Sequence, residues 1–161
     1  MLENSKKTNQ TRRNRGYSFE NSIVKEFNDS DGWIAKRLGS PSTALPDVMC
    51  VNDFYKTVIA IEAKSTVQNY AYVPQDQIER CRDWVNMFGV YDTKHVVLAF
   101  KFGYSMKVIG KNIQRRKTKI FYKVFSKSLK IGDIRADYDC NILLKSETGE
   151  WEPVELREFV R

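Results

Sequence analysis

The first clear hydrophobic pattern along the chain is helical. Four apolar side chains recur at intervals of three and four residues: Phe19, Ile23, Val24 and Phe27. This spacing predicts a helix over residues 16–29. Glu20 follows the same spacing and therefore lies on the apolar side. A carboxylate there is costly unless it is paired or binds a cation, so Glu20 is a candidate site residue; the alternative is a position at the margin of the stripe that reaches water.

Shorter apolar runs further along the chain predict the strands of a sheet. These runs cover residues 33–38, 47–51, 57–64, 94–102, 106–109 and 120–125. Between them, a second helical stripe predicts a helix over residues 74–88, with Pro74 in its first turn and Gly89 after its end. A turn-rich loop, residues 39–43, follows the first strand. The order of elements predicts an α/β fold with helices flanking a mixed β-sheet.

The charge is unevenly distributed along the chain. The 161 residues carry a net charge of +7, which favours a polyanionic partner. Residues 1–15 are expected to form a flexible basic arm, residues 16–126 the core domain, and residues 127–161 an extension of unknown role. Residues 111–130 hold eight Lys and Arg and no acid. Although such runs are often only solvated surface, two of them in a small domain favour nucleic acid as the partner.

Several other classes of protein fit the sequence poorly. The longest apolar stretches are too short to span a membrane, and the polar N-terminal residues do not form a signal peptide. The three cysteines are scattered without a CxxC pair, which favours a reducing, cytoplasmic setting. Together with the basic charge, we expect the protein to be associated with DNA inside the cell. A single histidine, His95, excludes a paired-histidine metal site and is expected to be structural.

Asp47 and a later Glu-Ala-Lys triplet are the strongest sign of chemistry. Glu62 and Lys64 end an apolar strand and point to the same face, because side chains alternate along a strand. Asp47 starts a neighbouring predicted strand. Asp47 and Glu62, with the Ala63 carbonyl and Glu20, are candidate ligands for Mg²⁺, with Mn²⁺ able to substitute. Such a centre activates water against a phosphodiester while Lys64 stabilises charge on the phosphate, which predicts a nuclease.

The order of several short motifs resembles a known family. The motifs are Arg15-Gly16-Tyr17-Ser18-Phe19-Glu20, Ala35-Lys36-Arg37-Leu38-Gly39-Ser40, Leu45-Pro46-Asp47-Val48, Ile61-Glu62-Ala63-Lys64-Ser65-Thr66 and Tyr72-Val73-Pro74-Gln75-Asp76-Gln77. Over residues 12–110 the chain resembles the archaeal Holliday junction resolvases of the PD-(D/E)xK nuclease superfamily. The resemblance implies a restriction-endonuclease-like sheet, and a homodimer that cuts branched double-stranded DNA by paired nicks.

The same resemblance implies roles for individual residues. It places Glu20, Asp47, Glu62 and Lys64 in the catalytic centre, with Ser40 and Gln77 beside them. It also assigns DNA contact to a basic set: Arg12, Arg13, Arg15, Arg37 and the loop residue Ser40. One departure is Asn21, where some relatives carry a basic residue after the helical acid.

Other interpretations remain open at this point. Arg37, Ser40 and Gln77 also fit ordinary strand, turn and helix-surface positions. Apolar residues on the second helix, Trp84, Met87 and Phe88, fit either dimer contacts or core. The alternative functions are a restriction-like or repair endonuclease of the same superfamily, which cuts other DNA, and a nucleic-acid-binding protein without catalysis.

Overall fold

The structure is a computed structural model that describes residues 2–39, 44–109 and 112–160, with side chains for 10–39, 44–106 and 115–160. These residues hold two helices, α1 (Leu2–Asn28) and α2 (Gln75–Asn86). The strands are β1 (Trp33–Arg37), β2 (Val48–Asn52), β3 (Thr57–Thr66), β4 (Tyr70–Val73), β5 (Thr93–Phe102), β6 (Ser105–Ile109), β7 (Asn112–Arg116), β8 (Lys119–Phe125), β9 (Ile134–Asp137), β10 (Ile142–Lys145) and β11 (Trp151–Pro153). Neither helix is long and apolar enough to cross a membrane.

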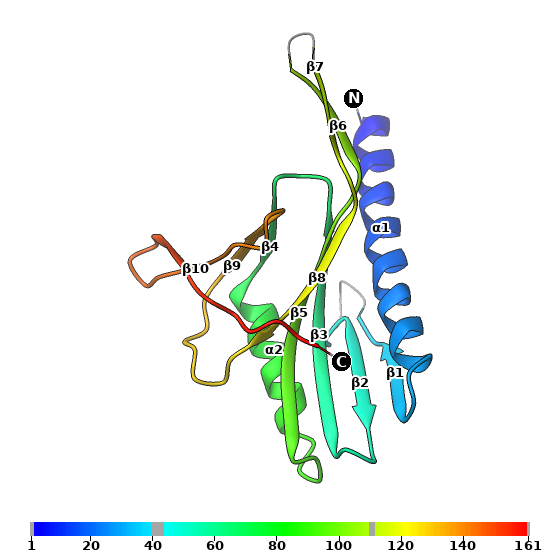
Figure 1. Cartoon of the computed structure of the whole chain (residues 1–161), viewed down its shortest axis with the longest axis vertical. Coiled ribbons are helices and arrows are strands. Elements are labelled where there is room, and N and C mark those ends of the chain that lie inside the picture. The colour runs from blue at the N-terminus through cyan, green and yellow to red at the C-terminus, as the bar shows by residue number, and fades with distance from the viewer. Residues whose placement is uncertain (1, 40–43, 110–111, 161) are drawn as a thin grey trace.

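The central sheet has the strand order β1-β2-β3-β5-β8 (Figure 1). The pairs β1–β2, β2–β3 and β5–β8 are antiparallel, whereas β3 and β5 are parallel. A parallel pair needs a long crossover, and here the chain passes through β4 and α2 between the two strands. The predicted α/β fold with a mixed sheet flanked by helices is confirmed.

Each face of the central sheet has its own core. Side chains alternate along β3, so Ile59 and Ile61 pack with α1 while Val58 and Ala60 face α2. Because both faces are covered, β3 is apolar at consecutive positions rather than at every second one. This burial fixes the register of β3, and with it the direction in which the polar residues at its end point.

Helix α1 is longer than the hydrophobic pattern predicted. It begins at Leu2 rather than at residue 16, so the basic residues expected to form a flexible arm belong to the helix. Residues 2–15 contain neither Pro nor Gly and are rich in residues that tolerate a helix, but they have no apolar stripe. Periodicity therefore gave no signal for this half of the helix.

A second sheet, with strand order β11-β10-β9-β4, lies on the α2 side of the central sheet. Its register pairs Ala71 with Ala136 and Val73 with Ile134, and all four side chains are buried. The extension whose role the sequence left open thus completes a core on this side. The sequence pattern missed β4, β7, β9, β10 and β11, because strands of three to five residues carry little periodicity.

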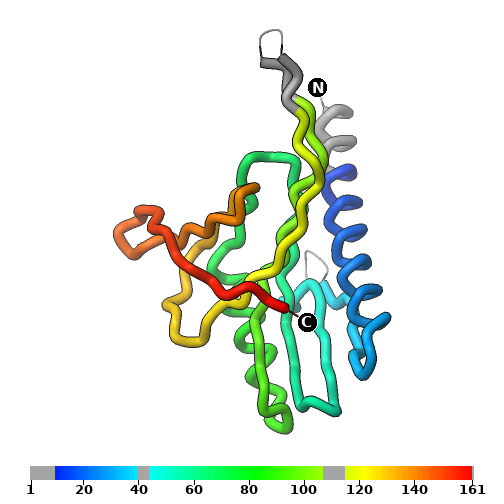
Figure 2. The backbone as a smooth tube through the Cα atoms, in the orientation of Figure 1, coloured from blue at the N-terminus to red at the C-terminus, as the bar shows by residue number. Residues whose placement is uncertain are grey.

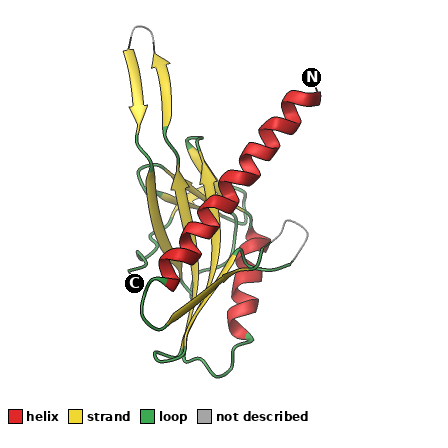
Figure 3. Cartoon of the chain, turned by 90° about the vertical axis from the view of Figure 1, so that its right-hand side faces the viewer, coloured by secondary structure: helices red, strands yellow, loops and turns green. Residues whose placement is uncertain are grey.

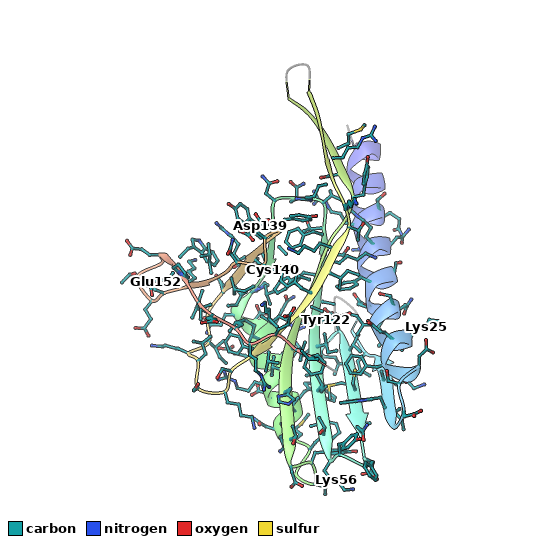
Figure 4. All side chains as sticks on the ribbon, in the orientation of Figure 1. Lys25, Lys56, Tyr122, Asp139, Cys140 and Glu152 are labelled. Atoms are coloured by element: carbon teal, nitrogen blue, oxygen red, sulfur yellow. The ribbon has the colours of Figure 1, made fainter. Side chains whose placement is uncertain are left out.

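The C-terminal tail returns to the central sheet and ends beside β8 (Figure 2). The Val124 amide donates to the Arg157 carbonyl at 2.8 Å, and the Phe159 amide donates to the Tyr122 carbonyl at 3.1 Å. The Tyr122 hydroxyl, labelled in Figure 4, donates to Glu26 Oε2 at 2.9 Å and so joins β8 to α1. The last residues therefore close one edge of the central sheet.

Strands β6 and β7 form a hairpin between β5 and β8. The hairpin and the N-terminal half of α1 project beyond the same end of the sheet and diverge from each other (Figure 3). At the hairpin base, Arg116 Nη2 donates to the carbonyls of Val67 at 2.8 Å and Gln68 at 3.1 Å. The same guanidinium lies over the rings of Phe102 and Tyr138. The base of the hairpin is therefore fixed to the rest of the fold.

Candidate active site

Glu62 and Lys64 lie together near the C-terminal end of β3. Glu62 is only 1% exposed, and Lys64 Nζ donates to its Oε1 at 2.6 Å. The prediction that these two side chains share a face is confirmed. The apolar run before them anchors the strand between two cores, so the pair is held in place by burial of its neighbours.

Asp47 reaches the same part of β3 from the start of β2. Its Oδ2 accepts a hydrogen bond from the Ala63 amide at 2.8 Å. Its own carbonyl accepts from the amides of Leu38, at 2.9 Å, and Gly39, at 3.3 Å. Asp47 is therefore held through its backbone by β1 and through its side chain by β3.

The Glu62 carboxyl is a weaker acid than an ordinary glutamate. Its pKa is raised to about 7, chiefly by burial; Lys64 lowers it, and the charge of Asp47 and a hydrogen bond with Asp47 raise it. Among the described residues, the buried Glu62 Oε2 atom has no hydrogen-bond partner. Asp47 and Glu62 thus form a close acidic pair that either a proton or a cation would stabilise.

Glu20 approaches Asp47 from the α1 side of the sheet. It is 7% exposed, and Arg37 Nη1 donates to its Oε2 at 3.2 Å while lying 4.5 Å from the centre of the Tyr17 ring. Burial is the main cause that raises the pKa of Glu20, and the Asp47 charge adds to it; Arg37 and Lys64 act in the opposite direction. Glu20 is therefore electrostatically coupled to Asp47, Arg37 and Lys64.

The donor set suits a hard divalent cation, although it is small. No group of three or more His, Cys, Asp or Glu side chains capable of holding a metal lies among the described residues. Asp47 and Glu62 supply two carboxylates and an orphaned buried oxygen, which fits a cation such as Mg²⁺ that keeps several water ligands. Glu20 feels the charges of Asp47 and Lys64 but bonds to Arg37, so it fits an outer position better than a direct ligand.

Comparison with known proteins decides the family. The family model described as archaeal Holliday junction resolvase (Hjc) matches residues 11–138. The chain belongs to this family. A search of curated proteins found no match. Among solved structures, the chain is similar to Hjc of Archaeoglobus fulgidus, a Holliday junction resolvase from an archaeal hyperthermophile; identity is 19%, coverage 77% of this chain and 84% of that one, and the TM-score 0.49.

The residues matched by the Hjc family model include all the predicted site residues. The structure brings some of them to the acidic pair and does not describe one of them. Gln77 lies on α2, one turn before Cys81, and its Oε1 is buried without a partner among the described atoms. Since the charges of Glu62 and Asp47 raise the pKa of Cys81, after burial as the main cause, this face of α2 adjoins the acidic pair. Ser40 lies outside the described residues.

The basic residues that the resemblance assigned to DNA contact lie on two elements. Arg12 and Arg13 are exposed on α1, and Arg15 is half-buried with its Nε enclosed and unbonded among the described atoms. Arg37 lies on β1, where its bond to Glu20 gives it a role in the site besides any contact with phosphate. The structure thus separates a basic helix surface from one arginine beside the carboxylates.

Sequence reasoning missed three residues that support Asp47. A Cβ at Gly39 would lie 2.9 Å from Asp47 Oδ1 and 3.0 Å from its Cα, so any larger residue there would displace Asp47. Arg80 Nη1 donates to the Leu45 carbonyl, and Trp84 Nε1 to the Ala44 carbonyl, both at 3.2 Å. Only the motif that contains Gly39 signalled such support in the sequence. The contacts between α2 and the segment before Asp47 cannot be predicted from the spacing of residues along the chain.

Proposed function

We propose that this Hjc-family protein is a Mg²⁺-dependent endonuclease that resolves four-way DNA junctions by paired nicks. One observation carries the proposal: the Asp47 and Glu62 carboxylates face each other beside the Lys64 ammonium at one end of a buried strand. A buried acidic pair with an unpaired carboxylate oxygen destabilises the fold, so we expect it to serve function rather than structure.

Each residue of the centre has a task in phosphodiester hydrolysis. Asp47 and Glu62 would hold the cation, together with the Ala63 carbonyl, and Glu20 would bind its water shell. The bound cation supplies a water of lowered pKa and neutralises charge on the phosphate. Lys64, held at 2.6 Å from Glu62, orients the attacking water or donates to the phosphate oxygen as charge develops there.

The DNA contacts proposed here are contacts to phosphate rather than to bases. Arg12 and Arg13 are exposed and would bind the backbone of an arm, while Arg37 lies close enough to Glu20 to act near the scissile phosphate. Such contacts position a duplex without reading its sequence. Selection of a junction would then come from shape, and the protein would act inside the cell on its DNA.

Paired nicks require two centres, so we propose a homodimer with one centre in each subunit. Met87, the residue that caps the C-terminus of α2, is 64% exposed and remains a proposed contact between subunits. Trp84, which was predicted either to pack or to join a dimer, also donates its indole N–H to the segment before Asp47.

The test is cleavage of a labelled immobile four-way junction in Mg²⁺ and in EDTA, beside a linear duplex of the same sequence. We expect symmetric nicks in Mg²⁺ on the junction, none in EDTA, and far slower cutting of the duplex. Glu62→Gln, which keeps the shape of the side chain, is expected to bind the junction without cutting it. Equal cleavage rates on both substrates would instead favour the restriction-like or repair function. If the unaltered chain bound the junction but cut neither substrate, the nuclease proposal would be wrong.

A further inference from the structure

A long basic segment of the chain lies outside the proposed catalytic site. The chain has no Asp or Glu between Asp92 and Asp133, and the hairpin of β6 and β7 occupies the middle of this interval. Ten basic residues lie within residues 101–130: Lys101, Lys107, Lys111, Arg115, Arg116, Lys117, Lys119, Lys123, Lys127 and Lys130. A hairpin that projects from the fold with no acid to neutralise it has a strong affinity for polyanions.

The charges at the base of the hairpin have different partners. Arg116 is tied to the turn after β3, and Lys119 Nζ lies 5.2 Å from the centre of the Tyr138 ring. Arg115 and Lys117, on either side of Arg116, are exposed, and their side chains form no hydrogen bond or ion pair with the described residues. One arginine thus fixes the direction of the hairpin, while its two neighbours leave their charges available to a ligand.

The hairpin extends away from the catalytic centre along the strand direction. Glu62 on β3 is level with Leu98 on β5, and β5 leads into the hairpin (Figure 1). At about 3.3 Å per residue, the chain from Leu98 to Ile109 spans up to about 35 Å. This distance corresponds to roughly ten base pairs at about 3.4 Å each.

We propose that the hairpin of β6 and β7 is a second DNA contact, which binds backbone phosphates of one duplex arm up to about ten base pairs from the cleavage point. The inference rests on the proposed function and adds to it a fixed reach along the arm. Helix α1 leaves the same end of the sheet in another direction, so helix and hairpin would contact different stretches of phosphate (Figure 3). The contact is independent of sequence, because Lys and Arg side chains at this reach neutralise phosphates.

The test compares junctions with short arms, of about 6 base pairs, and long arms, of about 20 base pairs, without divalent cation so that binding is measured apart from cutting. The variant is Arg115→Gln with Lys117→Gln. Its control is Lys127→Gln with Arg157→Gln, which removes the same two charges from exposed positions at the far end of β8. Circular dichroism and sedimentation check folding and oligomeric state.

We expect the hairpin variant to bind long-arm junctions about tenfold more weakly, and the slope of log K against log salt to fall by up to about 2, since each phosphate contact contributes about 0.9. Binding to short-arm junctions, and binding by the control variant, should change little. An equal loss on both arm lengths, or no loss, would overturn the inference. A loss of dimer with an unchanged dependence on arm length would also overturn it and would assign the hairpin to an interface between copies.

The two proposals can fail separately. If the chain binds long arms through the hairpin but cuts no junction, the proposed function fails and the DNA contact stands. If it resolves junctions with no dependence on arm length or on Arg115 and Lys117, the contact fails and the nuclease stands.

Discussion

The Asp47 carboxylate accepts a hydrogen bond from the Ala63 amide at 2.8 Å, which ties the start of β2 to the backbone between Glu62 and Lys64. One carboxylate oxygen thus positions the acid, and the other leaves a position for the cation that we propose. The hydrogen bond explains how Asp47 and Glu62, which are fifteen residues apart in sequence, come to lie at one point of the fold.

Asp47→Asn is expected to reduce junction cleavage by roughly 10²–10³-fold, because a neutral amide is a poor ligand for Mg²⁺. Junction binding should be unchanged or tighter, because a negative charge beside the phosphate is lost. The bond to Ala63 survives through the amide oxygen, so stability should change little. Single-turnover cleavage and gel-shift titration measure both quantities; undiminished Mg²⁺-dependent nicking by this variant would contradict the assignment of Asp47.

Glu62 should make the metal-free protein less stable as pH rises. Its pKa is raised to about 7 in the fold from an ordinary value of 4.5, so the folded state holds the proton more tightly. The contribution of Glu62 is complete below pH 4.5 and is lost as pH rises to about 7. Glu62→Gln should therefore gain stability over the unaltered chain, by on the order of 2–3 kcal/mol more at pH 8 than at pH 4.5. Denaturant unfolding in EDTA gives the difference, and a constant difference across this range would refute it.

Mg²⁺ should restore the stability that is lost through Glu62 at high pH, and it should do so in the unaltered chain but not in Glu62→Gln. A cation bound by Asp47 and Glu62 stabilises the folded state by mass action. At pH 8 we expect the melting temperature of the unaltered chain to rise with Mg²⁺, while Glu62→Gln shows little change. The same measurement with Ca²⁺ shows whether any divalent cation, and not only Mg²⁺, raises the melting temperature. If both proteins gain stability equally, the cation binds elsewhere.

Gly39→Ala is expected to damage the site through contact with backbone. Its Cβ would meet the Asp47 Cα at 3.0 Å, which a rotamer change cannot relieve. We expect a loss of about 1–3 kcal/mol of stability and a fall in cleavage larger than the loss of folded protein explains. Gly89→Ala is the matched control, since no atom lies within 4 Å of a Cβ there. Full activity in Gly39→Ala would show that Asp47 tolerates displacement.

Trp84→Phe tests whether α2 positions Asp47 through the segment before it. Phenylalanine keeps an aromatic ring but removes the donor that bonds the Ala44 carbonyl. We expect kcat to fall several-fold with junction affinity unchanged, and a loss of about 1 kcal/mol of stability or less. A fall in affinity alone, with kcat retained, would mean that this segment contacts DNA rather than places the carboxylate.

Sequence reasoning succeeded where burial left a regular pattern. The apolar run before Glu62 predicted both the strand and the shared face of Glu62 and Lys64, because a period of two decides side-chain direction. The helical spacing of Phe19 and Ile23 predicted an inward Glu20, which is confirmed by its burial. These residues owe their positions to local geometry, so local sequence was sufficient.

The same reasoning failed where contacts between distant segments decide the structure. The bond from Arg37 to Glu20 and the support that Arg80 gives to Leu45 depend on how helices pack on the sheet, which spacing does not encode. The C-terminal strands are too short for a period, and their pairing with β4 joins residues more than sixty positions apart.

The return of the C-terminal tail to β8 limits how two copies can join. An outer strand with unpaired amides and carbonyls recruits strands from other molecules, and residues 157–159 satisfy those groups along the middle of β8. A second copy of the chain therefore cannot extend the central sheet by pairing with this part of β8. A chain ending at Pro153 would lose this protection, and its natural failure would be ordered self-association rather than simple unfolding.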